Sequence, residues 1–132
     1  DALPICNFRD ASFDTVIMTQ AIQAVEKPDV LLEDMLRVGR EVIITFPNFA
    51  HWTTRFYLTL KGMMPVSEAL PYTWYNTPNI HLCTFNDFDA LCREKGIKVL
   101  DRIAVDGGQQ GSVLARMFPN LFGEVAIYRL TR

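Results

Sequence analysis

The chain has 132 residues, of which 49% are hydrophobic and 21% are charged, as in an ordinary globular domain or a large piece of one. Its net charge of −2 gives no electrostatic reason to expect a nucleic acid or an anionic membrane as a partner. No apolar run approaches the length that a membrane-spanning helix needs.

Two strands and an intervening helix are expected in the first third of the chain. Phe13–Met18 is nearly continuous in apolar and β-branched residues, which is typical of a strand buried on both faces of a parallel sheet. A helix should begin near Pro28, and Gly39 should end it in the left-handed conformation. Glu41–Phe46 repeats the buried-strand pattern. Short connections in a strand–helix–strand unit predict a right-handed parallel crossover.

Two further helices are expected in the middle of the chain, on either side of a loop. Phe49–Met64 predicts a helix because four large apolar residues recur at spacings of three and four. These are Trp52, Phe56, Leu60 and Met63. Pro65–Pro78 is typical of a loop, and Thr84 is a good N-cap for a helix over Thr84–Lys95 that Gly96 ends.

The last part of the chain predicts two strands without a full helix between them. Ile97–Val105 and Glu124–Leu130 have strand composition, and they are separated by a glycine-rich loop at 106–111 and a short helix at Ser112–Phe118. Such strands can pair antiparallel.

Several of these segments resemble the class I S-adenosylmethionine-dependent methyltransferases. Ser12–Met18 is similar to the fourth strand of that superfamily, Leu36–Ile44 to its fifth, and Val125–Tyr128 to its seventh. The seventh strand of the superfamily lies antiparallel between the fifth and the sixth. The resemblance therefore implies an α/β fold, the C-terminal part of a Rossmann-like sheet that is mostly parallel with an antiparallel last strand.

A closer resemblance, over nearly the whole chain, is to the family of the methionine biosynthesis protein MetW. Its most specific part is Leu70–His81, which contains Pro-Tyr-x-Trp-Tyr-x-Thr-Pro-Asn-Ile-His. Thr19–Val25, Phe46–Trp52 and Asn120–Gly123 are similar too. The resemblance implies a role in methionine biosynthesis together with homoserine O-acyltransferase. The alternative is a small-molecule methyltransferase of another pathway.

The glycine-rich loop that holds S-adenosylmethionine in the superfamily has no counterpart here. Such a loop needs glycine so that the ligand can approach the backbone, yet no glycine precedes Gly39. We therefore expect residues 1–132 to be a partial domain, strands four to seven, with the N-terminal cofactor-loop half absent. The chain also begins without Met, which indicates a processed product, a cloned segment or an incomplete sequence. S-adenosylmethionine is the expected cofactor of the intact protein and is not expected to bind this piece alone.

Polar residues follow the first two predicted strands, where ligands bind in open α/β sheets. By resemblance, Thr19, Gln20 and Gln23 line the cofactor, although an ordinary polar turn has the same composition. Asn48 can hydrogen-bond a substrate or cap the next helix, and His51 can act as a general base or pack on the surface of that helix. For His51, packing is the favoured interpretation.

The segment between the two middle helices is rich in aromatic residues that carry polar groups. Loops of this kind cover sites or form partner surfaces, and the alternative is that the rings pack into the core. We expect a lid or a docking surface. Its candidate residues are Tyr72, Trp74, Tyr75, Asn79 and His81.

The cysteines give no sign of a disulfide framework or a metal site. Cys6, Cys83 and Cys92 are odd in number, and their spacings, with or without the two histidines, match no zinc pattern. A reduced, cytoplasmic compartment and no bound metal are expected. The superfamily's strands before the fourth have no counterpart ahead of Phe13. The sheet edge beside the Phe13–Met18 strand is therefore expected to be exposed, which favours self-association.

Overall fold

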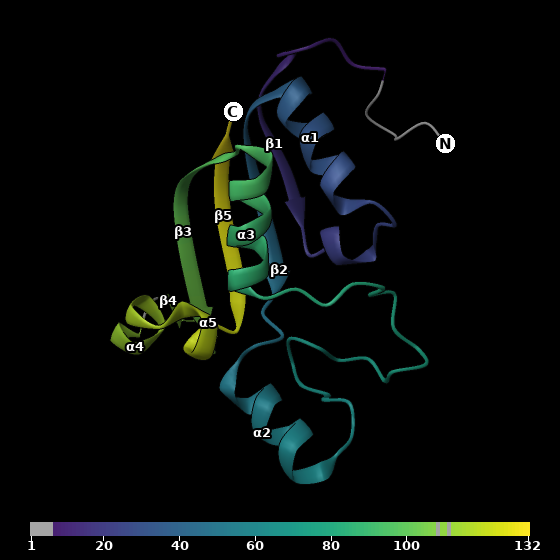
Figure 1. Ribbon diagram of the computed structural model, residues 1–132, viewed down its shortest axis with the longest axis vertical. Coiled ribbons are helices and arrows are strands. Elements are labelled where there is room, and N and C mark those ends of the chain that lie inside the picture. Colours follow the sequence, from purple (N-terminus) through teal and green to yellow (C-terminus); the bar gives the residue numbers. More distant parts are fainter. Residues whose placement is uncertain (1–6, 108, 111) are drawn as a thin grey trace.

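The computed structural model describes residues 7–107, 109–110 and 112–132, so Cys6 lies outside the described part. Within that part, one sheet has the strand order β1-β2-β5-β3-β4 (Figure 1). The strands are β1 (Phe13–Thr19), β2 (Gly39–Pro47), β3 (Lys98–Asp106), β4 (Gln109–Gln110) and β5 (Val125–Thr131). The helices are α1 (Pro28–Val38), α2 (Trp52–Lys61), α3 (Phe85–Lys95), α4 (Val113–Met117) and α5 (Pro119–Phe122), with a single 3-10 turn, η1, at Ile22–Ala24.

The sheet topology confirms the predicted α/β fold. Strands β1 and β2 are parallel neighbours, with Val16 opposite Val42 and Thr19 opposite Thr45. Strand β5 lies between β2 and β3 and is antiparallel to both, so β1, β2 and β3 all run in one direction. The last strand thus occupies the inserted, antiparallel position that the resemblance implied. The predicted loop at 106–111 is partly wrong, because Gln109–Gln110 pairs with the end of β3.

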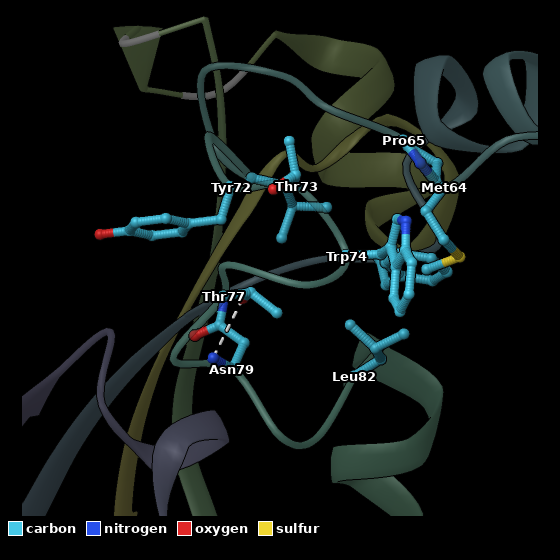
Figure 2. Close-up of a pocket in the computed structure, with 10 residues that line it drawn as sticks. Met64, Pro65, Tyr72, Thr73, Trp74, Thr77, Asn79 and Leu82 are labelled. Atoms are coloured by element: carbon cyan, nitrogen blue, oxygen red, sulfur yellow. Dashed lines mark hydrogen bonds between the residues drawn. The ribbon is translucent and has the colours of Figure 1, made fainter.

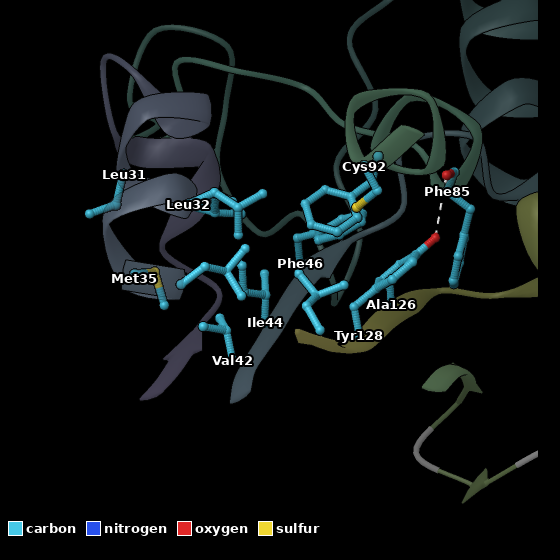
Figure 3. Close-up of a cluster of buried hydrophobic side chains, with 14 of the residues drawn as sticks. Leu31, Leu32, Met35, Val42, Ile44, Phe46, Phe85, Cys92, Ala126 and Tyr128 are labelled. Atoms are coloured by element: carbon cyan, nitrogen blue, oxygen red, sulfur yellow. Dashed lines mark hydrogen bonds between the residues drawn. The ribbon is translucent and has the colours of Figure 1, made fainter. Parts of the chain in front are cut away.

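Helices α1 and α3 cover one face of the sheet, and the core lies beneath them (Figure 3). At its centre, Phe46 of β2 stacks on Tyr128 of β5 with ring centroids 5.8 Å apart. The Tyr128 hydroxyl donates to the Asp89 carboxylate of α3 at 2.8 Å, so this buried polar group is satisfied. Burial raises the Tyr128 pKa, and the Asp89 bond adds to that effect. Burying a ring such as Phe46 contributes about 2 kcal/mol.

The opposite face of the sheet is less covered, and β1 in particular is more exposed than its composition predicts. Ile17 is exposed, and only Val16 and Met18 of the strand are half-buried. The prediction that Phe13–Met18 is buried on both faces is therefore wrong for the described residues. The physical reason is position: β1 is the first strand in the sheet order, and its outer edge pairs with no other described strand. Self-association through this edge stays a prediction.

Helix α1 begins and ends close to the predicted residues, but Gly39 has a different role. Pro28 occupies the first turn, and Leu32 and Met35 are fully buried in the core. Gly39 is not left-handed; its φ of −110° and ψ of 144° are extended and open strand β2. A Cβ at Gly39 would lie 2.6 Å from Val16 Cγ2, so close packing against β1 is what requires glycine.

Helices α2 and α3 differ in how they meet the sheet. In α3, Thr84 caps the helix by accepting from the Asp87 amide at 3.1 Å, as predicted, and Gly96 ends it with a φ of +67°. Helix α2 is shorter than the predicted Phe49–Met64 and stands apart from the sheet in Figure 1. In the part of the chain that the structure describes, no helix is long and apolar enough to cross a membrane.

Candidate ligand-binding edge of the sheet

The carboxyl ends of β1 and β2 meet at one edge of the sheet, where the predicted cofactor residues lie. Thr19 ends β1 opposite Thr45, and β2 runs two residues further to Pro47. Thr19 and Gln20 are exposed there, while Gln23 in the following turn is 6% exposed. Ligands of open α/β sheets bind at this kind of edge.

The backbone of Gln20 adopts a strained conformation that the sequence does not reveal. Its φ is +46°, a left-handed value that costs a residue with a Cβ on the order of 1 kcal/mol. The Gln20 amide donates to both the carbonyl and the hydroxyl oxygens of Thr45, at 2.9 and 3.0 Å. Strain of this kind gathers at functional sites. Thr45 therefore joins the candidate site, and its only sequence signal is a polar residue within an apolar strand.

Gln23 connects the strained turn to the aromatic segment. Its side-chain amide donates to the Gln20 carbonyl at 3.0 Å, and its own carbonyl accepts from the amides of Ile80 and His81 at 3.0 and 2.9 Å. The Gln23 side-chain oxygen is buried and has no hydrogen-bond partner among the described residues. The structure thus brings Thr19, Gln20, Gln23 and His81 together.

Asn48 lies in the same region, but the fold itself engages its side chain. The Asn48 amide nitrogen donates to the carbonyls of Asn120 and Gly123 at 3.0 and 2.7 Å, and its oxygen accepts from the Ala50 amide at 3.1 Å. The predicted alternative that Asn48 caps the next helix is wrong, because His51 is the residue at the start of α2. Asn48 joins the end of β2 to the segment before β5.

His51 is buried at the start of α2 and contacts Trp52 and Thr53 of that helix, which agrees with the favoured interpretation that it packs on the helix. The residue is 6% exposed, and its Nδ1 lies 2.7 Å from the Thr53 hydroxyl. Its Nε2 lies 3.7 Å from a carboxylate oxygen of Asp106, at the end of β3. Sequence reasoning did not identify Asp106, because 55 positions separate it from His51 in the chain and only the fold brings them together.

The aromatic segment is exposed, as expected of a lid or a docking surface, and does not pack into the core. Trp74 and Tyr75 are each 74% exposed and contact one another edge to face at 5.6 Å, and Tyr72 is also exposed. Figure 2 shows a hollow in which Trp74 lies beside Met64 and Leu82, with the Tyr72 ring turned outward. Asn79 lines the same hollow, and its backbone amide donates to the Thr77 hydroxyl. The His81 ring lies 3.3 Å from the Glu26 carbonyl.

The described cysteines are not activated nucleophiles. Burial raises the pKa of Cys83 to about 12 and that of Cys92 to about 11, so both thiols stay protonated near neutral pH. Over residues 7–107, 109–110 and 112–132, no group of three or more histidine, cysteine and acidic side chains is arranged to hold a metal ion.

The chain is similar over almost its full length to one part of a much longer curated protein. That relative is the bifunctional methionine biosynthesis protein MetXA/MetW of Rhodopirellula baltica. The two are 34% identical over 126 residues, which cover 95% of this chain and 20% of the relative. The chain therefore spans about a fifth of the length of that protein.

Solved structures of similar fold are also longer than this chain. An S-adenosylmethionine-dependent methyltransferase of Thermotoga maritima superposes with a TM-score of 0.58 at 18% identity, covering 98% of this chain and 59% of that one. The cyclase SpnF superposes with a TM-score of 0.57 at 14% identity, covering 99% and 53%. At such identities the likeness establishes the methyltransferase fold and nothing about activity.

The match to a protein family is more specific than the match to a fold. The sequence model described as methionine biosynthesis protein MetW matches residues 2–130. It covers the strained turn, the aromatic segment and the inserted last strand together. The chain belongs to the MetW family.

Proposed function

We propose that this chain is the later half of a MetW-type domain that acts in methionine biosynthesis as a partner of homoserine O-acyltransferase. The observation that carries the proposal is the bifunctional relative, in which units named MetXA and MetW share one polypeptide. Fusion keeps two units at a high effective concentration, which favours units that work together.

The side chains at the sheet edge agree with a binding role rather than with acid–base catalysis. The rings of both histidines contact other groups of the fold, His51 at Thr53 and His81 at the Glu26 carbonyl. The described thiols are protonated. Methyl transfer depends on positioning more than on an acid or a base, so these features do not by themselves exclude it.

S-adenosylmethionine is the proposed ligand of the intact protein at this edge. The residues present fit one side of such a ligand, because Thr19 and Gln20 expose polar groups where β1 ends and the Gln20 backbone is fixed by Thr45. When bound, the ligand would supply an activated methyl group. Thr19 and Gln20 would orient it, and Gln23 would hold the Gln20 turn in place.

Exposure of β1 supports the proposal that a further part of the domain adjoins this chain. An exposed Ile17 on a strand whose outer edge pairs with no described strand is expected where another strand and its covering helices pack in the intact protein. The similar structures are longer than this chain, which agrees with this view.

A second candidate is a methyltransferase acting on a small molecule of another pathway. The fold similarity to an S-adenosylmethionine-dependent methyltransferase is the observation in its favour. It requires cofactor binding and a methyl acceptor, whereas the partner role requires binding to the acyltransferase.

Two measurements on the intact protein test these proposals. Calorimetric titration with S-adenosylmethionine should give heat of binding, and no heat at millimolar ligand would remove cofactor binding and the methyltransferase candidate. Size-exclusion chromatography with homoserine O-acyltransferase should show co-elution, accompanied by a change in the acyltransferase rate. If neither co-elution nor a rate change occurs, the partner role is wrong.

A further inference from the structure

Helix α2 exposes the apolar face that a globular protein normally buries. Phe56 is 58% exposed and Leu60 is 80% exposed, and both lie on the same side of the helix, four residues apart. Trp52, one turn earlier, and Met63, just past the helix end, extend this row and are also exposed. We call these four side chains the α2 face. A row of large apolar side chains in water marks an interaction surface.

The residues that directly follow the α2 face in the chain contact the aromatic segment's hollow. Met64 and Pro65, which follow the helix, line the same hollow as Tyr72 and Trp74 (Figure 2). The helix and the aromatic segment also lie at the same end of the sheet in Figure 1. The surface therefore consists of one protruding helix, a hollow and a group of exposed rings.

The charges on helix α2 indicate the chemistry of its partner. Between Glu41 and Glu68 the sequence has no acidic residue, while Arg55 and Lys61 lie on α2 itself. Helix α2 is therefore cationic in a chain whose net charge is −2. An apolar groove bordered by carboxylates is complementary to it in both respects.

We propose that the α2 face, together with the aromatic segment, docks into an apolar, acid-rimmed groove on homoserine O-acyltransferase. This inference rests on the proposed function, because the partner is the unit named MetXA in the fused relative. An aromatic and aliphatic centre with a charged border is the usual composition of a protein interface.

Two other occupants of the α2 face fit less well. In a symmetric dimer the same surface contacts itself, so both copies would bring a cationic helix without any carboxylate to the interface. A membrane-surface helix needs a strongly basic polar face, whereas α2 carries two cations, Arg55 and Lys61. The net charge of −2 also opposes an anionic bilayer.

The test uses the intact protein with the double substitution Phe56→Glu and Leu60→Glu. Both positions are exposed and glutamate is a good helix former, so the fold and melting temperature should be retained. The dissociation constant for the acyltransferase, measured by calorimetry, should rise at least tenfold. The matched control is Val113→Glu on α4, where the side chain is 71% exposed, and it should bind within twofold of the wild type.

Each alternative result has a distinct meaning. If the wild type binds the acyltransferase and the double variant binds equally well, the docking inference is wrong and the proposed function stands. If the wild type itself neither binds nor changes the acyltransferase rate, the proposed function fails and the docking inference fails with it. Loss of self-association in the double variant, with acyltransferase binding retained, assigns the α2 face to a second copy. Loss of sedimentation with vesicles of phosphatidylcholine and phosphatidylserine, again with acyltransferase binding retained, assigns it to a membrane.

Alkylation of a Leu60→Cys variant tests whether the intact protein covers the α2 face itself. The introduced thiol should react rapidly with iodoacetamide in the free protein and at least tenfold more slowly in the complex. Slow reaction in the free protein would show that another part of the same protein covers the face, which overturns the inference.

Discussion

Asn48 is predicted to be a residue on which the fold depends, and replacing it tests that role directly. The Asn48→Ala substitution removes two donors from the Asn120 and Gly123 carbonyls and one acceptor from the Ala50 amide. The bond to Gly123 is buried, so no solvent replaces it without rearrangement. The substitution thus separates the end of β2 from the segment that leads into β5.

The expected loss follows from the number of bonds. Each net hydrogen bond contributes about 1 kcal/mol, so three bonds give a loss of roughly 3 kcal/mol in the free energy of unfolding. For an intact domain of about 150–250 residues, that loss lowers the melting temperature by roughly 6–12 °C. Asn48→Asp keeps the acceptor for Ala50 but turns a carboxylate toward two carbonyls, and it should be at least as destabilising.

The assay is thermal unfolding of the intact protein followed by circular dichroism, with Asn76→Ala in the exposed aromatic segment as the matched control. The control should melt within about 2 °C of the wild type, as surface substitutions usually do. If Asn48→Ala also melts within about 2 °C of the wild type but no longer binds S-adenosylmethionine or the acyltransferase, Asn48 is a binding residue and the structural role is refuted.

Three further predictions concern packing, ionisation and the sheet edge. Gly39→Ala should lower the free energy of unfolding, measured by chemical denaturation, by about 1–3 kcal/mol, because the added Cβ would lie 2.6 Å from Val16 Cγ2. An unchanged denaturation midpoint would show that β1 and β2 can move apart at no cost. Burial raises the pKa of Cys83 to about 12 from 9.0, so the thiol stays protonated in the folded state. Its contribution to the free energy of unfolding is complete below about pH 9. It falls as the pH rises toward 12, because the unfolded chain ionises first. The measurement is the denaturation midpoint at pH 8 and at pH 10.5. The midpoint should fall less between these two pH values in Cys83→Ala than in the wild type. The 132-residue chain alone should elute from a sizing column at a larger apparent mass than the monomer, because the outer edge of β1 pairs with no described strand. A monodisperse monomer with cooperative melting would contradict this.

The strand pattern and the family resemblance together predicted the central sheet. Parallel pairing of β1 with β2 followed from two apolar runs joined by one helix, and the inserted position of β5 followed from the resemblance. The cap of α3 was also predictable, because Thr84 and Asp87 are local in sequence. The strands and the cap depend on short-range patterns, which the sequence records directly, whereas the position of β5 came from the resemblance alone.

Features that depend on contacts between distant residues were not predictable. Glycine is required at position 39 because Val16 of the neighbouring strand lies so close, and Asp106 approaches His51 only because β3 brings it there. Periodicity identified the apolar side of α2, but it cannot say whether another element covers that side, and the described structure leaves Leu60 exposed. The left-handed backbone of Gln20 likewise follows from its two bonds to Thr45.

Hydrogen–deuterium exchange on the intact protein, with and without homoserine O-acyltransferase, tests the partner role most directly. Amides of α2 and of residues 70–81 should exchange more slowly in the complex, while those of α4 should exchange at the same rate in both samples. Equal exchange across the whole chain at saturating acyltransferase, or slowing confined to α4, would contradict a MetW-type protein that acts by docking this end of its sheet onto that enzyme.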